Sequence, residues 1–567
     1  MFVAFSHGQG IPATAGQSQN SSGQFGYYFS DASEAPFDAN TLDSLDAVHR
    51  DMVETSAGPE GDHSSLPPIF TYLGQFIDHD ITGISANSDA DPLLPIDDEN
   101  LAPEQRDALV QKIVNLRTGR FDLDSLYGTF TPTGNDALDK LIQLFRFPGD
   151  RAMMWIGTFG DLDRRVEFPL DPGGDLLRLG RLLESGRFTE DDINALPEEH
   201  KRLFVDGDGN LNLSRAIIGD ARNDENLFIA QLHLAFLRFH NRVVQEWPVA
   251  RQAGDEDRVF EWARGHVRRF YQWLVVNVWL PGVCDPKVVR SILDQGPKLY
   301  DAFLAKINWS PGDRLPMPME FSTACYRFGH SMVRGNYDWN ENFGRGPDPL
   351  LPEAGFELMF LFTGGSTSPL GGASDHKLPG NWGADWDRLV HPMSNFADRS
   401  TRLVDTALAA PLTKMDNEGG SATNQNLIAR NLRRGVQHNL PTAQEAIKAL
   451  NAMGIPVPAL TKAQIASGST AGEIKDGGFD EHTPLWFYTL KEAELLGRGQ
   501  RLGPMGSHIV AGTIIGLIKR GEGSVLDDPG SNEGRWHPVD GPRVSGQLVD
   551  SFPALMRAAL VMHNPDA

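Results

Sequence analysis

Residues 72–83 read YLGQFIDHDITG, a short apolar segment that carries an amide, an imidazole and two carboxylates. Gln75, Asp78 and His79 are three and four residues apart, and these spacings place side chains on one face of a helix. A carboxylate and an imidazole are costly to bury among apolar neighbours unless something pairs with them. Either a packed polar network in the core or a cofactor with a reactive centre would satisfy them. The segment therefore predicts a buried helix whose polar face has a partner elsewhere.

Three further clusters follow in the chain. Residues 222–225 read RNDE and open a long apolar stretch that ends in FHNR at 239–242. Residues 326–331 read YRFGHS, and residues 430–441 read RNLRRGVQHNLP. Arg222 and Glu225 are three residues apart, so we expect them to share a face of the first turn of one helix. Four such clusters in this order are far more specific than any one of them.

Together the four clusters resemble the animal haem peroxidase family of the peroxidase–cyclooxygenase superfamily, from about residue 60 to about residue 530. GQxxDHD is similar to the distal-histidine motif, RxxE to the distal-arginine motif and RxGH to the proximal-histidine motif. Residues 431–441 resemble the segment that supplies the asparagine partner of the proximal histidine. The chain looks like a minimal, bacterial-type member without a long propeptide. The resemblance implies a mainly α fold with few short strands and a haem b buried between central helices.

The residue types suit peroxide chemistry. His79, with an unperturbed pKa near neutrality, fits the base that moves a proton between the peroxide oxygens. Arg222 keeps its charge and directs donors to the bond that polarises. Gln75 matches a family position near the distal water and halide site. His330 matches the axial iron ligand, and the amide oxygen of Asn431 is expected to accept the hydrogen bond of its other ring nitrogen.

Two carboxylates match positions that form ester bonds to haem methyl groups in the family. These are Asp78 and Glu225. Pairing of Asp78 with an arginine, and a favourable position of Glu225 at a helix N-terminus, are the alternatives. Asn226 stands where some relatives have a methionine that makes a third, sulfonium link, so that link is not expected. Arg327 and Arg434 belong to the matching motifs and are expected to lie against the cofactor.

Calcium is the second ligand that the resemblance implies. The family site joins the aspartate after the distal histidine, here Asp80, to a downstream loop. Thr118, Asp122 and Asp124 would supply side-chain oxygens, and Arg120 would supply its carbonyl oxygen. Hard oxygen ligands at alternate positions suit this ion. Many relatives have serine in place of Asp124, and a solvated acidic turn is the alternative interpretation.

Other patterns in the sequence give less information about function. Residues 206–210, DGDGN, begin like a calcium-binding EF-hand loop, but Leu211 and Ile217 stand where glycine and glutamate are needed, so a tight turn is predicted. His240 is expected to be a packed structural histidine, and His438 is left without a role. No HExxH string is present to indicate a zinc hydrolase.

Charge and hydropathy limit the partners. Lys and Arg number 51 against 75 Asp and Glu, a net charge of −24, which disfavours nucleic acid and anionic membranes as partners. The longest apolar stretch, residues 273–280, is interrupted by Asn277 and stopped by Pro281, too short to span a bilayer. Two cysteines, Cys284 and Cys325, permit at most one disulfide. We expect a soluble protein whose partners are small molecules, with its oligomeric state open.

The domain organisation is expected to be simple, because no linker, repeat or charge block divides the chain. We predict a partly irregular N-terminal arm over 1–60, a haem peroxidase domain over 61–545 and a C-terminal extension packed on it over 546–567. The first residues, MFVAFSHG, lack a basic region followed by a sustained apolar run, so no cleavable signal peptide is expected. A cytoplasmic location follows, unless export uses a route without a cleaved signal.

Helical periodicity dominates the chain and convincing alternating strands are few. We predict helices over residues 67–79, 102–116, 135–146, 223–247, 256–279, 287–295, 318–333, 425–436, 442–451, 485–496 and 505–519.

The resemblance implies a haem peroxidase that uses hydrogen peroxide to oxidise small donors such as halide, thiocyanate or aromatic compounds. A lipid dioxygenase or cyclooxygenase-like enzyme is the first alternative. Such members place a radical-forming tyrosine three residues before the proximal histidine, where this chain has Arg327. Tyr326 is one residue further away and is expected to point elsewhere on the helix. A haem-free adhesion or scaffold protein is the second alternative, and retention of all four motifs speaks against it.

Overall fold

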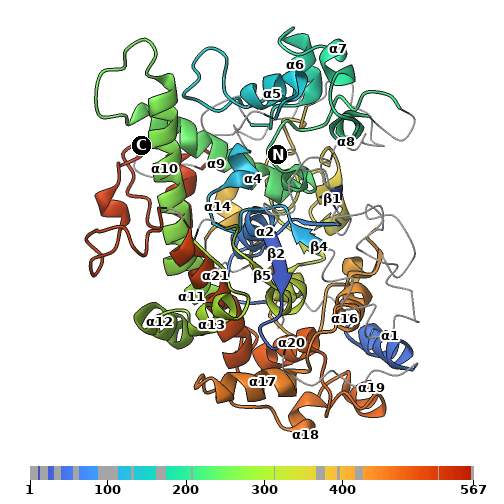
Figure 1. The fold of residues 1–567 in the computed structure, drawn as a ribbon. Coiled ribbons are helices and arrows are strands. Elements are labelled where there is room, and N and C mark those ends of the chain that lie inside the picture. The colour runs from blue at the N-terminus through green and yellow to red at the C-terminus, as the bar shows by residue number, and fades with distance from the viewer. Residues whose placement is uncertain are drawn as a thin grey trace.

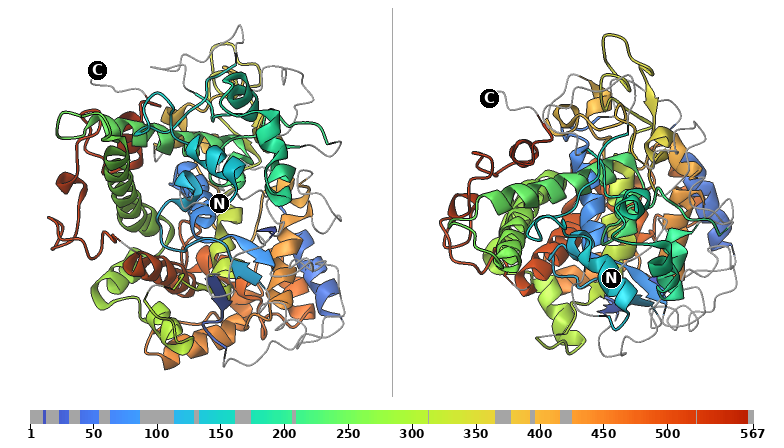
Figure 2. Two further views of the ribbon diagram at one scale, coloured as in Figure 1. Left: turned by 45° about the horizontal axis from the view of Figure 1, so that its top comes forward. Right: turned by 90° about the horizontal axis from the view of Figure 1, so that it is seen from above.

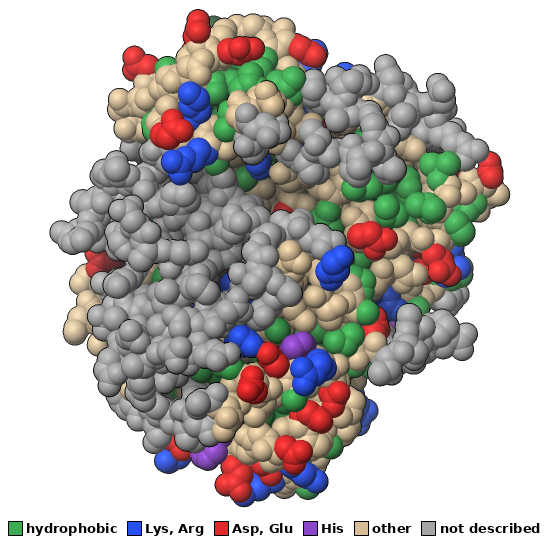
Figure 3. Space-filling model, turned by 90° about the vertical axis from the view of Figure 1, so that its right-hand side faces the viewer, with side chains coloured by type: hydrophobic (Ala, Val, Ile, Leu, Met, Phe, Trp, Pro, Cys, Tyr) green, Lys and Arg blue, Asp and Glu red, His purple; other side chains and the backbone are tan. Residues whose placement is uncertain are grey.

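The structure is mainly α-helical, which confirms the predicted fold class (Figure 1). This computed structural model describes residues 11–12, 23–30, 40–54, 63–86, 113–128, 133–160, 174–205, 209–311, 313–364, 377–391, 396–415, 425–521 and 523–562. Buried apolar side chains from Tyr28 to Met562 form one contiguous cluster, so the described helices share a core. No helix in these ranges is both long and apolar enough to cross a membrane. On the face drawn in Figure 3, acidic and basic side chains are interspersed.

Three helices pack on one another, with α2 (Ile69–Ile81) near the middle of the molecule and α10 (Glu256–Leu274) towards one side (Figures 1 and 2). The third is α9 (Leu227–Gln245). Phe76 of α2 stacks on Phe236 of α9 with ring centroids 5.0 Å apart, and Tyr271 of α10 meets both rings edge-on. Buried aromatic rings contribute large apolar areas. This trio therefore holds α2 at a fixed position against α9, the two helices beside the site described below.

The predicted helix 223–247 begins later than expected. Ala221–Asp224 form a short 3-10 helix, η3, and the side chain of Asn226 then caps α9 by accepting from the N–H of Ile229 at 3.1 Å. The prediction that Arg222 and Glu225 share the first turn of one α-helix is therefore wrong. A capping asparagine inside the predicted helix favours a start at the following residue.

The predicted helix 256–279 is confirmed in extent but not in winding. After α10, residues Val275–Trp279 form a π-helix, η4, that runs into α11 (Leu280–Val283). The side chain of Asn277 donates to the carbonyl of Trp273 at 3.0 Å. Pro281 lies in the first turn of α11, where its missing N–H is tolerated, so the helix continues beyond its predicted end at residue 279.

The segment predicted as an α-helix over 318–333 is wound differently. It forms a π-helix, η5 (Glu320–Ala324), followed by a 3-10 helix, η6 (Cys325–Met332). Ala324 joins them with φ −123° and ψ −73°, outside helical geometry. Helix α20 (Leu485–Leu495) supports η6, because the indole of Trp486 donates to the carbonyl of Arg327 at 3.1 Å. Hydrophobic spacing alone does not distinguish these windings, so the sequence predicted only a helix.

The remaining long helices were predicted within a few residues. They are α5 (Asp136–Gln143), α12 (Pro286–Gln295), α16 (Leu427–Gln437), α17 (Ala443–Ala452) and α21 (Pro504–Arg520), in addition to α20. Most of the predicted helix 102–116 lies outside the described residues, and its last part is a strand.

Several helices were not predicted. Three of them have seven or more residues: α1 (Thr41–Asp51), α13 (Lys298–Lys306) and α22 (Phe552–Ala558). The others are short: α4 (Asp124–Tyr127), α6 (Leu179–Glu184), α7 (Glu190–Asn194), α8 (Glu198–Lys201), α14 (Trp386–Leu389), α18 (Lys462–Ile465) and α19 (Ala471–Asp476), with 3-10 turns at Arg202–Phe204, Phe356–Phe360, Ala397–Arg399, Ala410–Thr413 and Pro538–Asp540.

Five very short strands form a sheet in the order β1-β3-β4-β2-β5. Their bounds are Ile11–Pro12 (β1), Gly23–Gly26 (β2), Ile84–Ala86 (β3), Ile113–Asn115 (β4) and Met317–Pro318 (β5). Strand β2 pairs in parallel with β5, just before η5, so this part of the predicted N-terminal arm is a strand. A second pair joins β6 (Asn336–Tyr337) to β7 (Ala354–Gly355).

Candidate active site and metal site

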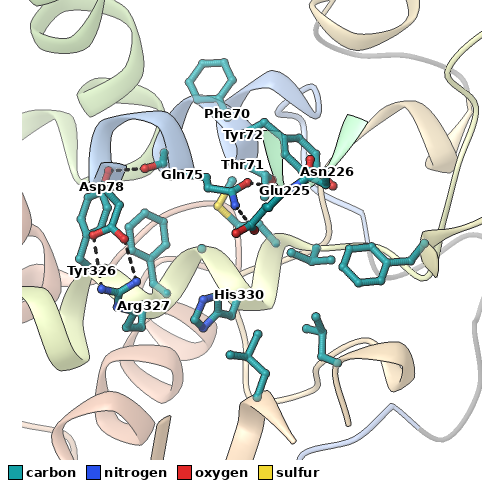
Figure 4. Close-up of a pocket in the computed structure, with 18 of the residues that line it drawn as sticks. Phe70, Thr71, Tyr72, Gln75, Asp78, Glu225, Asn226, Tyr326, Arg327 and His330 are labelled. Carbon is teal, nitrogen blue, oxygen red and sulfur yellow. Dashed lines mark hydrogen bonds and ion pairs between the residues drawn. The ribbon is translucent and has the colours of Figure 1, made fainter. Parts of the chain in front are cut away.

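A cavity lies between α2 and the start of α9 on one side and η6 on the other (Figure 4). Its empty space, with the open solvent at its mouth included, is about 750 Å³. Gln75 and Asp78 line it from α2, Glu225 from the turn before α9, and Arg327 and His330 from η6. The rest of the lining is largely apolar and aromatic, and includes Phe70, Tyr72, Trp279, Phe328, Phe360 and Leu427. An apolar cavity with a few convergent polar groups is the usual form of a cofactor or substrate site.

His330 faces the cavity with Asn431 of α16 behind it. The two residues are 101 positions apart in the chain, yet Nδ2 of Asn431 lies 2.9 Å from Nδ1 of His330. The same Nδ2 donates to the carbonyl of Leu427 at 2.7 Å. The pairing of these residues was predicted, but the amide nitrogen, not the oxygen, faces the imidazole. The contact to Leu427 fits this orientation of the amide, and the hydrogen-bonding role of Nδ1 depends on which ring nitrogen of His330 carries the proton.

The opposite wall carries an amide–carboxylate network. Nε2 of Gln75 donates to Oε1 of Glu225 at 2.5 Å, and Nδ2 of Asn226 donates to Oε1 of Gln75 at 3.2 Å. The hydroxyl of Thr363 donates to the carbonyl of Glu225 at 3.1 Å. These bonds join α2 to the start of α9 across the cavity wall. Sequence spacing did not predict them.

Asp78 and Arg327 join the two walls. The guanidinium donates to both carboxylate oxygens, at 2.9 and 3.4 Å, and its Nε donates to the carbonyl of Ser322 at 2.7 Å. Pairing with an arginine, the alternative interpretation of Asp78, is the arrangement observed. Tyr326 also lines the cavity, and its hydroxyl donates to the carbonyl of Gly74 at 2.9 Å. The prediction that Tyr326 points elsewhere is wrong, because the 3-10 winding of η6 changes the angle between successive side chains.

His79 and Arg222 lie behind the α2 wall and do not line the cavity. His79 is fully buried and its Nδ1 is 2.8 Å from Oδ1 of Asn223. The guanidinium of Arg222 donates to the carbonyl of His79 at 3.1 Å and pairs with Asp220 at 2.7 Å. Burial, with the charge of Arg222, lowers the pKa of His79 to about 4. The imidazole is therefore neutral near pH 7 and able to accept a proton.

Sequence reasoning missed Asp220. It is fully buried between Arg117 and Arg222, whose guanidinium groups hold its pKa well below its usual range despite the opposing effect of burial. Asp220 orients Arg222 through Nε and the second terminal nitrogen. In the sequence, Asp220 is only a carboxylate two residues before the proposed distal arginine, a spacing that matches no recognisable motif.

Three carboxylates gather at the predicted metal site. Oxygens of Asp80, Asp122 and Asp124 lie within 4.8 Å of one another. Oδ2 of Asp80 is buried, with no hydrogen-bond partner among the described residues. Burial and the neighbouring carboxylates raise the pKa of Asp80 well above its usual value, and burial raises that of Asp124 to about 6. A divalent cation would relieve this repulsion and complete the orphaned oxygen, so the residues fit calcium.

Of the other two predicted calcium ligands, Thr118 reaches the carboxylate cluster, whereas the carbonyl of Arg120 lies against a different residue. The hydroxyl of Thr118 donates to Oδ1 of Asp122 at 2.9 Å, which brings it to the cluster. The carbonyl of Arg120 lies against Gly521, where a Cβ would come within 2.6 Å of the oxygen. The guanidinium of Arg120 donates to the carbonyl of Asp313. Three carboxylates and one hydroxyl therefore form the core of the candidate site.

The remaining residues that the sequence singled out lie outside the cavity lining and the carboxylate cluster, or outside the described residues. His240 bonds the hydroxyl of Tyr127 and the carbonyl of Ala152, each at 3.0 Å, which confirms a structural histidine. Arg434 lies one turn after Asn431 on α16 and is not part of the cavity lining. Residues 206–208 of the predicted turn lie outside the described part of the chain. Cys284 and Cys325 are both buried free thiols.

Comparison with known proteins identifies relatives. Residues 178–452 match the family model for animal haem peroxidase. A peroxidase-like protein of Margaritifera margaritifera is 26% identical over 409 residues, covering 68% of this chain and 45% of that protein. Thyroid peroxidase of Homo sapiens is 26% identical over 264 residues, covering 46% of this chain and 25% of that protein. The chain thus spans less than half the length of these curated relatives.

Solved structures agree at the level of fold. Peroxidase A from Dictyostelium discoideum superposes with a TM-score of 0.55 at 15% identity, covering 96% of this chain and 93% of that one. A fatty acid alpha-dioxygenase from Oryza sativa superposes with a TM-score of 0.53 at 14% identity, covering 93% and 78%. Both peroxidases and dioxygenases therefore share this architecture.

Proposed function

Given that this chain belongs to the animal haem peroxidase family of the peroxidase–cyclooxygenase superfamily, we propose that it binds haem and uses hydrogen peroxide to oxidise small donors. The observation that carries the proposal is His330, held by Asn431, facing an apolar cavity whose opposite wall presents Gln75, Asp78 and Glu225. A donor set of one imidazole, apolar walls and a few polar groups fits haem.

Bound haem would supply the iron centre at which peroxide is cleaved. His330 would hold the iron, and Asn431 would fix the orientation of the ring. His79 would accept the proton of the incoming peroxide, since its ring is neutral near pH 7. Arg222 would place a fixed positive charge beside that ring, because it already donates to the carbonyl of His79.

Further family features are part of the proposal. Asp78 and Glu225 line the cavity and would carry the ester links to haem methyl groups. Asp80 follows His79 directly, so calcium held by the three carboxylates would stabilise the end of α2 that carries the base. Halide, thiocyanate and aromatic compounds are the donors proposed.

The test is spectroscopic and kinetic. Purified protein reconstituted with haem is expected to show a Soret band that shifts on addition of hydrogen peroxide. The variant His330→Ala is expected to lose this band. A steady-state screen of iodide, bromide, thiocyanate and phenolic donors then identifies the substrate class. Absence of haem uptake by the folded wild-type protein would overturn the proposal.

Tyr326 supports a second candidate function, a lipid oxygenase. Its phenol lines the cavity, and the same architecture serves a fatty acid alpha-dioxygenase. Its hydroxyl, however, already donates to the carbonyl of Gly74. Oxygen uptake with a long-chain fatty acid that is lost in Tyr326→Phe would favour this function. Retention of peroxide-dependent donor oxidation in Tyr326→Phe would favour the peroxidase.

A further inference from the structure

A buried chain of hydrogen bonds leads from His79 away from the cavity. Oδ1 of Asn223 lies 2.8 Å from Nδ1 of His79, and Nδ2 of the same amide lies 3.0 Å from Nδ1 of His233 in α9. All three side chains are completely buried. The residues come from three different elements, α2, η3 and α9, so the chain exists only in the folded protein.

His233 has no other evident polar role. Among the described residues, its Nε2 has no hydrogen-bond partner, so its one hydrogen bond is to Asn223. Leaving a buried ring nitrogen unpaired costs about 1–3 kcal/mol, and an apolar side chain would avoid this cost. Its ring packs edge-on against Phe76, a contact that an apolar residue could also make. The polar role of His233 is therefore its hydrogen bond with the amide of Asn223.

We propose that Asn223 and His233 are positioning residues that fix the proton of the His79 imidazole on Nδ1, leaving Nε2 as the basic nitrogen for peroxide. This inference rests on the proposed function.

The two ends of the Asn223 amide determine which nitrogen of His79 carries the proton. A neutral imidazole has one N–H and one acceptor nitrogen, and an amide has a donor end and an acceptor end. Nδ2 of Asn223 faces Nδ1 of His233, and its Oδ1, which can only accept, faces Nδ1 of His79. This arrangement requires the proton of His233 to lie on its Nε2. The proton of His79 must then lie on Nδ1. Without His233 the amide is able to rotate, and a donor facing Nδ1 would move the proton to Nε2, where it blocks base catalysis.

The direct test is the tautomer of His79. Nitrogen-15 NMR of histidine-labelled protein, in the reduced carbon monoxide-bound and diamagnetic form, distinguishes a protonated from an unprotonated Nδ1. The His79 signal is identified by its loss in His79→Gln. The wild type is expected to carry the proton on Nδ1. Asn223→Leu and His233→Leu are expected to shift it towards Nε2. A wild-type ring protonated on Nε2 would overturn the proposal.

Cyanide binding gives a second readout that is not turnover, because hydrogen cyanide must give its proton to a base. At pH 7, Asn223→Leu and His233→Leu are expected to slow the association rate by about 10- to 100-fold, the usual effect of losing a partner that orients a site histidine. His233→Gln keeps an acceptor for Nδ2 of Asn223 and should restore the wild-type rate.

The matched control is Asn241→Leu. Asn241 is a second buried asparagine, on α9, and its amide bonds only the backbone of Met154. Wild-type cyanide rates in this control, with slow rates in the two relay variants, support the inference. Equal rates in all variants overturn it. Failure of wild type to take up haem would instead overturn the proposed function, and the tautomer can still be read in the haem-free protein.

Discussion

Arg327 donates two hydrogen bonds to the carboxylate of Asp78, and so joins the segment that carries His330 to the helix that carries His79. The two side chains are 249 positions apart in the chain. The carboxylate is 7% exposed and the guanidinium 14%, so water screens the pair only weakly. One ion pair thus spans the cavity on which the proposed chemistry depends.

We predict that Arg327→Gln destabilises the protein by about 3–5 kcal/mol, because it leaves a buried carboxylate without its partner. The double variant Arg327→Gln with Asp78→Asn is expected to recover much of this loss, since it removes both charges. Urea unfolding monitored by circular dichroism measures both values. A matched control is Arg181→Gln, which breaks an exposed pair with Glu184 and should change stability by less than about 1 kcal/mol. Equal losses in the two single variants would contradict the prediction.

The sequence identified the polar residues of the candidate site more accurately than it predicted their positions in the structure. His330 and Asn431 were paired through their motifs, and the structure brings them together. The spacing of Gln75, Asp78 and His79 predicted one helix face, yet only the first two line the cavity. His79 lies about 100° around the helix from Asp78, and that rotation carries its ring behind the wall towards Asn223.

A second prediction concerns pH. Glu320 accepts hydrogen bonds from the backbone N–H groups of Tyr28 and Phe29, and burial raises the pKa of its carboxyl from 4.5 to about 7. Between these values the folded protein binds more protons than the unfolded chain, so the free energy of unfolding falls as pH rises from about 4.5 to about 7. Glu492, whose pKa burial also raises to about 7, contributes in the same direction.

Glutamine resembles protonated glutamate, so Glu320→Gln is expected to remove roughly half of this pH dependence, about 3 kcal/mol. The double variant with Glu492→Gln should remove both contributions. Urea unfolding at pH 5, 6 and 7 provides the measurement. An unchanged slope in Glu320→Gln would show that its carboxyl titrates normally in the folded protein.

Calcium removal provides the third prediction. The purified protein is expected to contain calcium by elemental analysis, and chelation or Asp80→Ala should lower the melting temperature and haem content together. The physical reason is that Asp80, Asp122 and Asp124 repel one another, a repulsion that the guanidinium of Arg117 beside Asp124 offsets only in part. Asp139→Ala, at an acidic residue outside the cluster, is the control and should leave the metal content unchanged. Wild-type protein without any bound metal would contradict the assignment.

The fourth prediction concerns the base. His79→Ala is expected to slow the reaction with peroxide by about 100-fold or more, the usual contribution of a general base. Haem content should stay near that of wild type, because the proposed iron ligand is His330 on the other wall. Stopped-flow spectroscopy of the first peroxide-induced change in the Soret band measures the rate. An unchanged rate would mean that His79, which lies behind the cavity wall, does not reach the peroxide.

What the sequence could not predict is the geometry that depends on distant partners. Asp220 fixes Arg222 through two nitrogens, but a carboxylate two residues away in a polar string carries no recognisable pattern. The π and 3-10 winding of residues 320–332 follows from packing against α20 and from backbone bonds to Glu320, both contributed by residues distant in sequence. It is this winding that brings Tyr326 to the cavity beside His330.

The last prediction concerns covalent attachment of haem. Asp78 and Glu225 line the cavity from different elements; Asp78 accepts hydrogen bonds from Arg327 and Glu225 accepts one from Gln75. An ester at Asp78 would remove its charge and leave the guanidinium of Arg327 without its carboxylate, so we expect attachment at Glu225, which accepts from the neutral amide of Gln75, to be the more complete. Acid–ketone extraction after peroxide treatment should release little haem from wild type, some from Glu225→Val, and all from the double variant with Asp78→Val. Arg327→Gln, which removes the stranded charge, should raise attachment at Asp78. Mass spectrometry of a digest reads each link separately, and finding only free, unmodified haem after turnover would rule out attachment while leaving the peroxidase assignment in place.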